Sequence, residues 1–519
     1  MKLRLPARFA IVLAVAASCL DAPAQKDQPM ARTPDTVPAL QKRIDEIINQ
    51  RRYAEALWGV KIVSLDSGKT LYEHNAQKLF TPASNSKLYT MAMVLDRLGP
   101  DYRIKTSLYA RSRPDARGVL SGDLIIYGRG DPTINAQLHG SNIFNALEPL
   151  VSALANAGVK QISGDLIGDD SFFRSPPYGS SWDWEDLQYY YGAEISALTI
   201  NANTLELRVE PGDRVGAPCV LAFNPPSTYV AISNRTQTIA KGGRRRVELY
   251  RPLGENVVYV SGQVPMEDSV STEDVPIHRP ARLFTLLFRE ALAAKGITVA
   301  GRVRTMNWKD REAAPLDFNN CIELGSMESL PVRDIIREVQ KPSQNLYTDL
   351  MLEHVGATSL ASAPANPGEN LDGEDAGLRE LNKFLTQAGI KRGETIFDEG
   401  SGLSRDNLTT PNATVTLLAY MSRHKNAEIY IDALPVAGVD GTLRRRMKGT
   451  VAEGKIHAKT GTLRWAISMS GYVTTAAGER LVFSLMLNRY QNPDANRSKT
   501  ADLDAIGVLL AGFTGRSDK

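Results

Sequence analysis

The chain changes character twice along its length, and this alternation most constrains its fold. From about Arg103 to Arg304 it carries short runs typical of β-strands, such as Gly122–Tyr127 and Gly164–Asp169, separated by turn residues. Both flanks instead combine amphipathic helical patterns with strand-like segments. At 519 residues the chain also exceeds the size at which one hydrophobic core keeps growing. We therefore expect an α/β protein with a mainly β region inserted between two mixed segments.

Individual elements can also be predicted along the chain. Leu40, Ile44, Ile47 and Ile48 recur at helical spacing, and a second helix is expected to enter at Pro82 and stop before Gly99. Further helices are expected at Ile143–Ala157, Pro331–Gln340, Leu346–Val355, Leu378–Ala388 and Ala501–Phe513, and strands at Trp58–Leu65, Lys69–His74, Gly454–Leu463, Trp465–Thr475 and Leu481–Asn488.

Residues 1–24 have the pattern of a secretory signal peptide. Positively charged residues precede an apolar stretch from Phe9 to Leu20, which is too short to span a membrane, and Ala22-Pro23-Ala24 offers a cleavage site. An uncleaved anchor and a lipoprotein modified at Cys19 are the alternatives. We expect an exported protein, with no transmembrane span in the remaining sequence. In an oxidising compartment Cys219 and Cys321 either pair or remain buried thiols, and the sequence leaves this open.

Composition excludes several functions. Lys and Arg total 61 against 58 for Asp and Glu, and this balance does not suit a protein whose main partner is a nucleic acid. No His-Glu-x-x-His motif or Cys/His spacing indicates a metal site, so we expect neither metal nor cofactor. The Gly-x-Ser-x-Gly motif that would indicate a Ser-His-Asp hydrolase does not occur in the sequence.

Ser84-x-x-Lys87 lies at the start of a predicted helix. Residues three apart on a helix are neighbours, so Lys87 is expected beside the Ser84 hydroxyl. A serine needs a base to become a good nucleophile, and a lysine with its ordinary pKa of about 10.4 is charged at neutral pH. Burial and a second cation, for which Lys459 is the candidate, would lower the pKa of Lys87. The alternative is a helix with both residues on its surface.

Ser343-x-Asn345 is expected in a loop between two helices. There Ser343 would relay a proton to a leaving amine, and Asn345 would hydrogen-bond Lys87 or the substrate. The alternative is that these residues cap the helix that follows them, and both roles are compatible.

Lys459-Thr460-Gly461-Thr462 lies on a predicted strand, where Gly461 would let another backbone approach closely. A peptide could pair along this strand, with Lys459 and the two threonines around its terminal carboxylate. The alternative is an exposed edge strand that a lysine protects from aggregation.

The order of these three motifs resembles the class C low-molecular-mass penicillin-binding proteins, the D-alanyl-D-alanine carboxypeptidase/endopeptidase family. The number of residues between Ser84 and Ser343 also fits this family better than it fits the compact β-lactamases. Gln344 and Glu399 depart from its usual pattern. Four further stretches carry the resemblance: Gly130–Thr133, Asp398–Arg405, Ala437–Leu443 and His457–Leu463.

The resemblance implies a serine β-lactamase/transpeptidase-like domain, an antiparallel sheet flanked by helices, built from residues 25–103 and 305–519. Residues 104–304 would form one or two smaller β-rich domains, nested in sequence. It implies a periplasmic or cell-envelope enzyme that removes the terminal D-Ala of peptidoglycan stem peptides through an acyl-enzyme on Ser84. It also implies cleavage of D-Ala–diaminopimelate cross-links and covalent inhibition by β-lactams.

The resemblance also assigns residues around the substrate. Backbone N–H groups of Ser84 and Thr462 would form the oxyanion hole. Asp186 would meet the free amine of a stem peptide in a pocket completed by Arg446 and Leu463, or it would merely brace the turn around Trp182 and Trp184. A β-lactamase-like hydrolase and a non-catalytic penicillin- or peptidoglycan-binding protein remain alternatives. The balance of carboxypeptidase and endopeptidase activity and the oligomeric state are left open.

Overall fold

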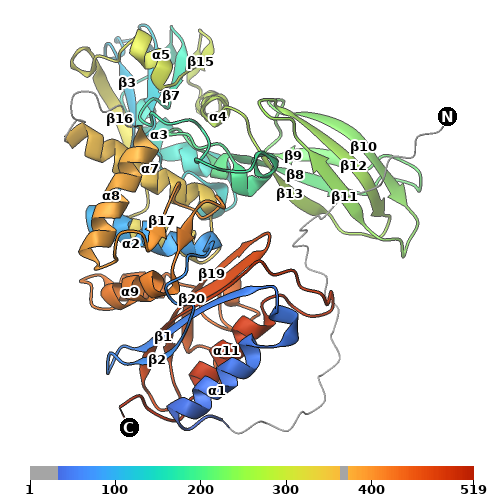
Figure 1. Ribbon diagram of the computed structural model, residues 1–519. Helices are drawn as coiled ribbons and strands as arrows, with labels where there is room; N and C mark the ends of the chain where they lie inside the picture. Colours follow the sequence, from blue (N-terminus) through green and yellow to red (C-terminus); the bar gives the residue numbers. More distant parts are fainter. Residues whose placement is uncertain (1–32, 363–371, 519) are drawn as a thin grey trace, which may run out of the picture. The chain divides into compact units, whose positions relative to one another are not determined.

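The computed structural model describes residues 33–362 and 372–518 (Figure 1). The predicted signal peptide, residues 1–24, lies outside the described residues. None of the helices in the described part is long and apolar enough to cross a membrane. Cys219 and Cys321 are both free thiols.

A five-stranded antiparallel sheet joins the two flanking segments of the chain. Strand β1 pairs with β21 over its whole length, from Leu57 opposite Asn488 to Ser64 opposite Leu481. The predicted strands are confirmed. The order across the sheet is β19 (Ile456–Leu463), β20 (Ala466–Thr474), β21 (Arg480–Asn488), β1 (Leu57–Ser64) and β2 (Thr70–His74).

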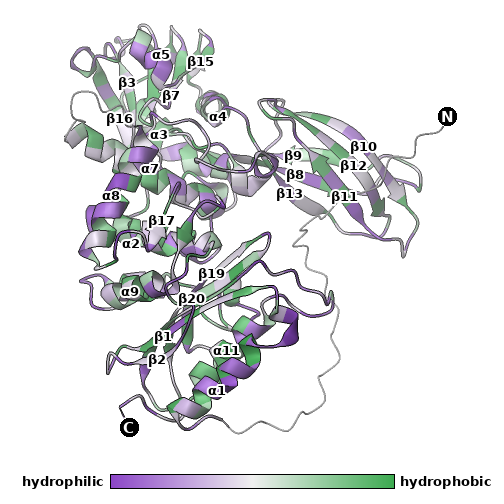
Figure 2. Cartoon of the chain, viewed as in Figure 1, coloured by the Kyte–Doolittle hydropathy of each residue, from purple (hydrophilic) through white to green (hydrophobic). Residues whose placement is uncertain are grey.

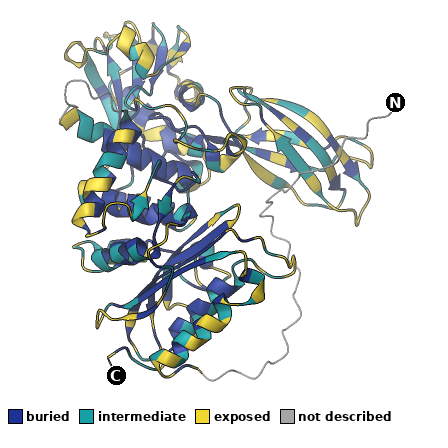
Figure 3. Cartoon of the chain, viewed as in Figure 1, coloured by how far each residue is buried: buried dark blue, intermediate teal, exposed yellow. Residues whose placement is uncertain are grey.

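Helices α1 (Val37–Ile48) and α11 (Ala501–Gly512) cover one face of this sheet, as Figure 1 shows. Of the predicted apolar stripe of α1, Leu40, Ile44 and Ile48 are buried in this core together with alternate residues of β1, and Ile47 is partly buried against it. The opposite side of α1 carries hydrophilic residues exposed to solvent (Figures 2 and 3). The spacing of apolar residues thus directs the helix onto the sheet.

A helical lobe packs near the other face of the sheet, with α2 at its centre. The lobe comprises α2 (Ser86–Leu98), α6 (Val332–Gln340), α7 (Asn345–Ser362), α8 (Gly373–Gln387), α9 (Pro411–Met421) and the short α10 (Ala427–Asp432). Every residue of α2 from Ser86 to Leu95 is buried. A helix surrounded on all sides is the setting in which a lysine side chain loses its water.

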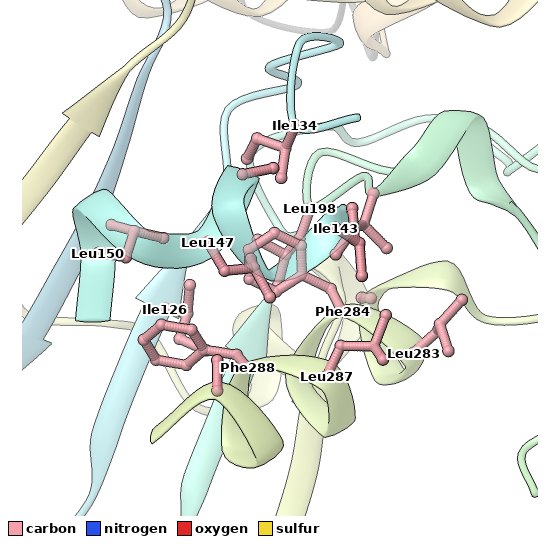
Figure 4. Packing of buried hydrophobic residues seen from close by; sticks show 14 of the residues in the cluster. Ile126, Ile134, Ile143, Leu147, Leu150, Leu198, Leu283, Phe284, Leu287 and Phe288 are labelled. Atoms are coloured by element: carbon pink, nitrogen blue, oxygen red, sulfur yellow. The ribbon is translucent and has the colours of Figure 1, made fainter. Parts of the chain in front are cut away.

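The inserted region contains a second five-stranded sheet. Its order is β15 (Val303–Met306), β7 (Leu166–Asp169), β5 (Leu124–Tyr127), β3 (Lys105–Ala110) and β16 (Ile322–Glu328). Helices α3 (Ile143–Asn156) and α4 (Pro280–Ala294) pack on it through Leu147, Phe284 and Phe288 (Figure 4). Short strands β4 (Val119–Leu120), β6 (Gln161–Ile162) and β14 (Thr298–Val299) form a separate small sheet.

The predicted boundary at 304/305 falls inside β15, and β16 still pairs with β3 at the start of the insertion. We therefore propose that the inserted region extends to Glu328. These pairings join strands about 130 to 220 residues apart, so no local pattern could have indicated them.

Two three-stranded sheets lie within the insertion, between β7 and α4 in sequence. One has the order β13 (Ser271–Pro276), β8 (Thr204–Glu210), β9 (Val220–Asn224), and the other β10 (Ala231–Ile239), β12 (Val257–Pro265), β11 (Arg246–Tyr250). In sequence, both sheets lie between two strands of the five-stranded inserted sheet, β7 and β15, which agrees with the predicted fold class.

Candidate active site

Ser84 lies in a short 3-10 turn, Ala83–Asn85, that leads directly into α2. Ala83 adopts a positive φ of 49°, a strained conformation for a residue with a side chain. The turn packs against β19 and β20: a Cβ on Gly461 would lie 2.6 Å from the Pro82 oxygen and 3.0 Å from the Ser84 nitrogen. Glycine at 461 therefore lets the strand approach the backbone of the Ser84 turn.

The Lys87 ammonium nitrogen lies at the centre of the site. Its Nζ is 3.0 Å from Ser84 Oγ, 2.6 Å from Asn345 Oδ1 and 2.5 Å from the carbonyl oxygen of Ser401. Lys87 is completely buried, and burial lowers its pKa to about 8, although the nearby carboxyl groups of Asp349 and Glu399 oppose this shift.

This geometry suits a neutral amine. Two N–H bonds of neutral Lys87 would point at Asn345 Oδ1 and the Ser401 carbonyl, which are acceptors only. The nitrogen lone pair is then left to accept the proton of the Ser84 hydroxyl. The arrangement can activate Ser84 as a nucleophile without a histidine.

Ser343 and Lys459 face each other across the site. Lys459 Nζ donates to Ser343 Oγ at 2.7 Å and to the carbonyl oxygen of Thr460 at 2.9 Å. Lys459 is also completely buried, and burial together with the positive charge of Lys87 holds its pKa well below the ordinary value. Two buried amines and two hydroxyls thus form a set of groups that can exchange protons.

Asn345 begins α7 and connects the lobe with the inserted region. Its Oδ1 accepts from Lys87, and its Nδ2 donates to the carbonyl oxygen of Tyr191 at 2.9 Å. Both ends of the amide are therefore engaged, which fixes its orientation. Asn345 is the first residue of the helix, and its side-chain bonds go to Lys87 and Tyr191 and not to the first N–H groups of the helix.

Asp186 lies close to this connection but already has partners. It is 8% exposed, hydrogen-bonds the Tyr191 side chain and has Arg405 Nη1 at 3.4 Å from Oδ2. Burial raises the pKa of Asp186, while Arg405 counteracts the shift. The structure thus places an arginine next to Asp186, and this arginine is Arg405.

Arg446 is not brought to this place. Its guanidinium donates to Asp504 of α11 at 2.6 Å and contacts the sulfur of Met469. Met469 belongs to the core on the α1 and α11 side of the sheet, whereas its neighbours Ser468 and Ser470 contact the Ser84 turn on the other side. Arg446 stabilises the packing of α11.

Strand β19 forms an edge of its sheet beside Ser84. Ala458 N–H donates outward to Pro435, so the backbone groups of Thr460 and Thr462 also point away from β20. Among the described residues, only the single bridge from His457 to Val436 pairs with this outer edge. The Thr462 side chain is exposed and Leu463 is half-buried, whereas the Thr460 hydroxyl is bonded to Thr442 at 2.7 Å.

Glu399 organises the loop that presents the Ser401 carbonyl to Lys87. This completely buried carboxyl accepts from the backbone nitrogens of Ser401 at 2.8 Å and Gly402 at 2.7 Å, and from Asn407 Nδ2 at 2.5 Å. Sequence reasoning treated Glu399 only as a departure from a family pattern and missed its role, as it missed Tyr191, Ser401 and Arg405. No residue-type pattern marks a backbone carbonyl as a ligand of a lysine.

No cluster of His, Cys, Asp and Glu that could hold a metal ion occurs in residues 33–362 and 372–518.

Comparison with known proteins agrees with this geometry. The family described as "D-Ala-D-Ala carboxypeptidase 3 (S13) family" matches residues 40–508. The chain belongs to this S13 peptidase family. It is a serine-type D-Ala-D-Ala carboxypeptidase of the low-molecular-mass penicillin-binding protein group, and the family consists of cell-wall peptidases, which act outside the cytoplasm.

Individual relatives of this S13 peptidase cover most of its length. It is 33% identical to a D-alanyl-D-alanine carboxypeptidase of Actinomadura sp. (strain R39), over 92% of this chain and 85% of that one. It is 25% identical to D-alanyl-D-alanine carboxypeptidase DacB of Haemophilus influenzae, over 85% and 87% of the two chains.

The fold of this S13 peptidase is shared with penicillin binding protein 4 (dacB) from Haemophilus influenzae. The crystal structure of that protein superposes with a TM-score of 0.74 at 22% identity, covering 91% of this chain and 99% of that chain. A second structure, of the same protein complexed with a novel β-lactam, superposes with a TM-score of 0.69 at 21% identity over 90% and 98% of the two chains. The expected α/β fold is confirmed.

Proposed function

We propose that this S13 peptidase removes the terminal D-Ala of peptidoglycan stem peptides through an acyl-enzyme on Ser84. The observation that carries the proposal is the position of Lys87 Nζ, completely buried and 3.0 Å from Ser84 Oγ, with two acceptors for its N–H bonds. This arrangement places a base of lowered pKa beside a nucleophile.

In the first half of the reaction, Lys87 takes the hydroxyl proton and Ser84 Oγ attacks the carbonyl carbon of the penultimate D-Ala. The bond from that carbon to the nitrogen of the terminal D-Ala then breaks. The leaving amine takes a proton from Ser343, which Lys459 resupplies through the 2.7 Å contact between them. In the second half, water attacks the ester carbon and its proton passes through Ser343 to Lys459. The bond from that carbon to Ser84 Oγ breaks, and Ser84 regains its proton from Lys87.

The peptide is expected to pair with the outer edge of β19. The N–H groups of Ser84 and Thr462 would receive the developing oxyanion, which preorganised backbone donors stabilise strongly. Lys459 and the exposed Thr462 would contact the terminal carboxylate. The Thr460 side chain contributes less to this contact in our proposal, because its hydroxyl is bonded to Thr442.

Two finer activities belong to the same proposal. A D-Ala–diaminopimelate cross-link presents the same acyl group with a larger amine leaving group, so the acyl-enzyme serves an endopeptidase as well. A β-lactam acylates Ser84 and blocks it, a proposal supported by the structure of the Haemophilus influenzae relative complexed with a novel β-lactam. We place the enzyme in the periplasm or cell envelope.

Asp186 and Arg405 are proposed to recognise the charged end of a stem peptide's third residue. A free amino acid end carries an amine and a carboxylate, which match a carboxylate and a guanidinium side by side. The contact from Tyr191 to Asn345 connects this pair to the catalytic groups.

Digestion of purified peptidoglycan, followed by mass analysis of the products, tests the function. Release of D-Ala from pentapeptides supports the carboxypeptidase, and loss of cross-linked dimers supports the endopeptidase. Rapid and repeated turnover of nitrocefin would indicate a β-lactamase instead. Penicillin labelling without release of D-Ala from any peptide would indicate a non-catalytic binding protein.

A further inference from the structure

The loop that carries Ser343 holds two unfavourable backbone conformations in succession. Lys341 is in the right-handed helical region although Pro342 follows it, a combination that steric contact with the proline ring disfavours. Ser343 then has a φ of 70°, in the left-handed region. Such a loop keeps its shape only where neighbouring contacts hold it.

Those contacts come from the segment between α10 and β19. Lys341 Nζ donates to Asp440 Oδ2 and to the carbonyl oxygen of Leu434, both at 2.6 Å. The Lys341 carbonyl oxygen in turn accepts from the Thr442 nitrogen at 3.1 Å. Gly441 permits this approach: its φ is 56°, and a Cβ there would lie 2.7 Å from the Lys341 oxygen.

The same segment is attached to β19. Thr442 Oγ1 is 2.7 Å from Thr460 Oγ1, and the second oxygen of Asp440 accepts from the nitrogen of Val436, which forms a bridge with His457. Lys459, the partner of Ser343, lies between His457 and Thr460 on this strand. Both members of the Ser343–Lys459 contact are thus anchored to one group of residues.

We propose that Lys341 and Asp440 are positioning residues that hold the Ser343 hydroxyl opposite Lys459 for proton transfer to the leaving group. Resting on the proposed function, this inference assigns the pair a specific step of it. Neither side chain contacts the reacting groups: Lys341 Nζ is occupied by Leu434 and Asp440, and the Asp440 side chain is 40% exposed. Their effect on catalysis must pass through the backbone of the Ser343 loop.

The test compares Lys341→Met and Asp440→Asn with Lys448→Met, a control at an exposed lysine of the same segment. We expect the first two variants to lower kcat for D-Ala release by about 10- to 100-fold, since displacement of a catalytic group by about 1 Å has effects of this size. KM and melting temperature should change little, and Lys448→Met should behave as the wild type. Asp440→Asn preserves size at a partly exposed position, so it is expected to fold.

Repeating the test in a Ser343→Ala protein distinguishes an effect on the position of Ser343 from a general loss of activity. In Ser343→Ala protein the hydroxyl is already absent, so Lys341→Met should cause no further loss of kcat. The inference would be overturned if Lys341→Met lowered the kcat of the Ser343→Ala protein by a further factor. It would also be overturned if Lys341→Met and Asp440→Asn alone both kept the wild-type kcat. The proposed function fails separately, since it requires the wild-type protein itself to release D-Ala.

Discussion

Replacing Lys87 with arginine tests the assignment of the base most directly. The variant keeps a positive charge and a long side chain but cannot supply a neutral nitrogen, because guanidinium does not deprotonate in proteins. General-base catalysis contributes about 10²- to 10⁴-fold, so we expect Lys87→Arg to lose acylation by at least this factor. Arginine is larger than lysine, so circular dichroism must first show that the variant is folded.

The lowered pKa of Lys87 also predicts how the acylation rate of the wild type depends on pH. With a pKa of about 8, about 10% of Lys87 is neutral at pH 7, compared with about 0.03% for a lysine of ordinary pKa. The active form is the neutral one and the pKa is lowered, so activity rises with pH. Acylation should increase about tenfold per pH unit below pH 7 and level off above about pH 8.

Stopped-flow acylation by a chromogenic β-lactam, measured from pH 5.5 to 9.5, is the assay. A matched control is Lys87→Met, which removes the base without the bulk of a guanidinium and should lose acylation equally. The reasoning is refuted by a folded arginine variant that acylates within tenfold of the wild type. It is equally refuted by a wild-type rate that stays flat between pH 6 and 8.

Four further outcomes are expected. Ser84→Ala should show no penicillin adduct by intact-mass spectrometry while remaining folded; an adduct on this variant would exclude Ser84 as nucleophile. Gly461→Ala should lower acylation, because its Cβ would meet the Pro82 oxygen and the Ser84 nitrogen, and penicillin labelling at the wild-type rate would contradict this. Glu399→Gln should lower stability by about 1.5–3 kcal/mol, seen as a lower denaturation midpoint, because buried backbone donors lose a charged acceptor. Asp186→Asn should reduce kcat/KM for free-amine stem peptides more than for N-acetylated ones, and an equal effect on both would remove Asp186 from recognition.

Patterns with a local cause were read correctly from the sequence. The stripe Leu40, Ile44, Ile48 became α1, and the C-terminal strands and helix formed as predicted, because apolar periodicity decides which face of an element is buried. The three motifs could also be located, since each is a short run with a recognisable residue pattern. Their meeting at one point was expected from the chemistry that Lys87 requires and from the family resemblance.

Features with a tertiary cause were not accessible. The family resemblance assigned Arg446 to the pocket around Asp186. The structure instead brings in Arg405 from a loop 219 residues away from Asp186. The pairing of β16 with β3, on which our proposed boundary of the insertion rests, also joins residues far apart in sequence. Contacts between residues far apart in sequence are decided by packing, and the local composition does not indicate them.

Burial on all sides of α2 explains how the pKa of Lys87 is lowered and why this shift could not be predicted from the sequence. The spacing of Ser84 and Lys87 predicts that they are neighbours, but neighbouring residues on an exposed helix would leave the lysine charged. The surrounding lobe removes water from Lys87, and Asn345 and the Ser401 carbonyl, in a loop held by Glu399, accept hydrogen bonds from its amine. A polar group buried without such partners would destabilise the lobe. We therefore expect a change that weakens the loop from Glu399 to Asn407 to lower both the acylation rate and the stability of the protein.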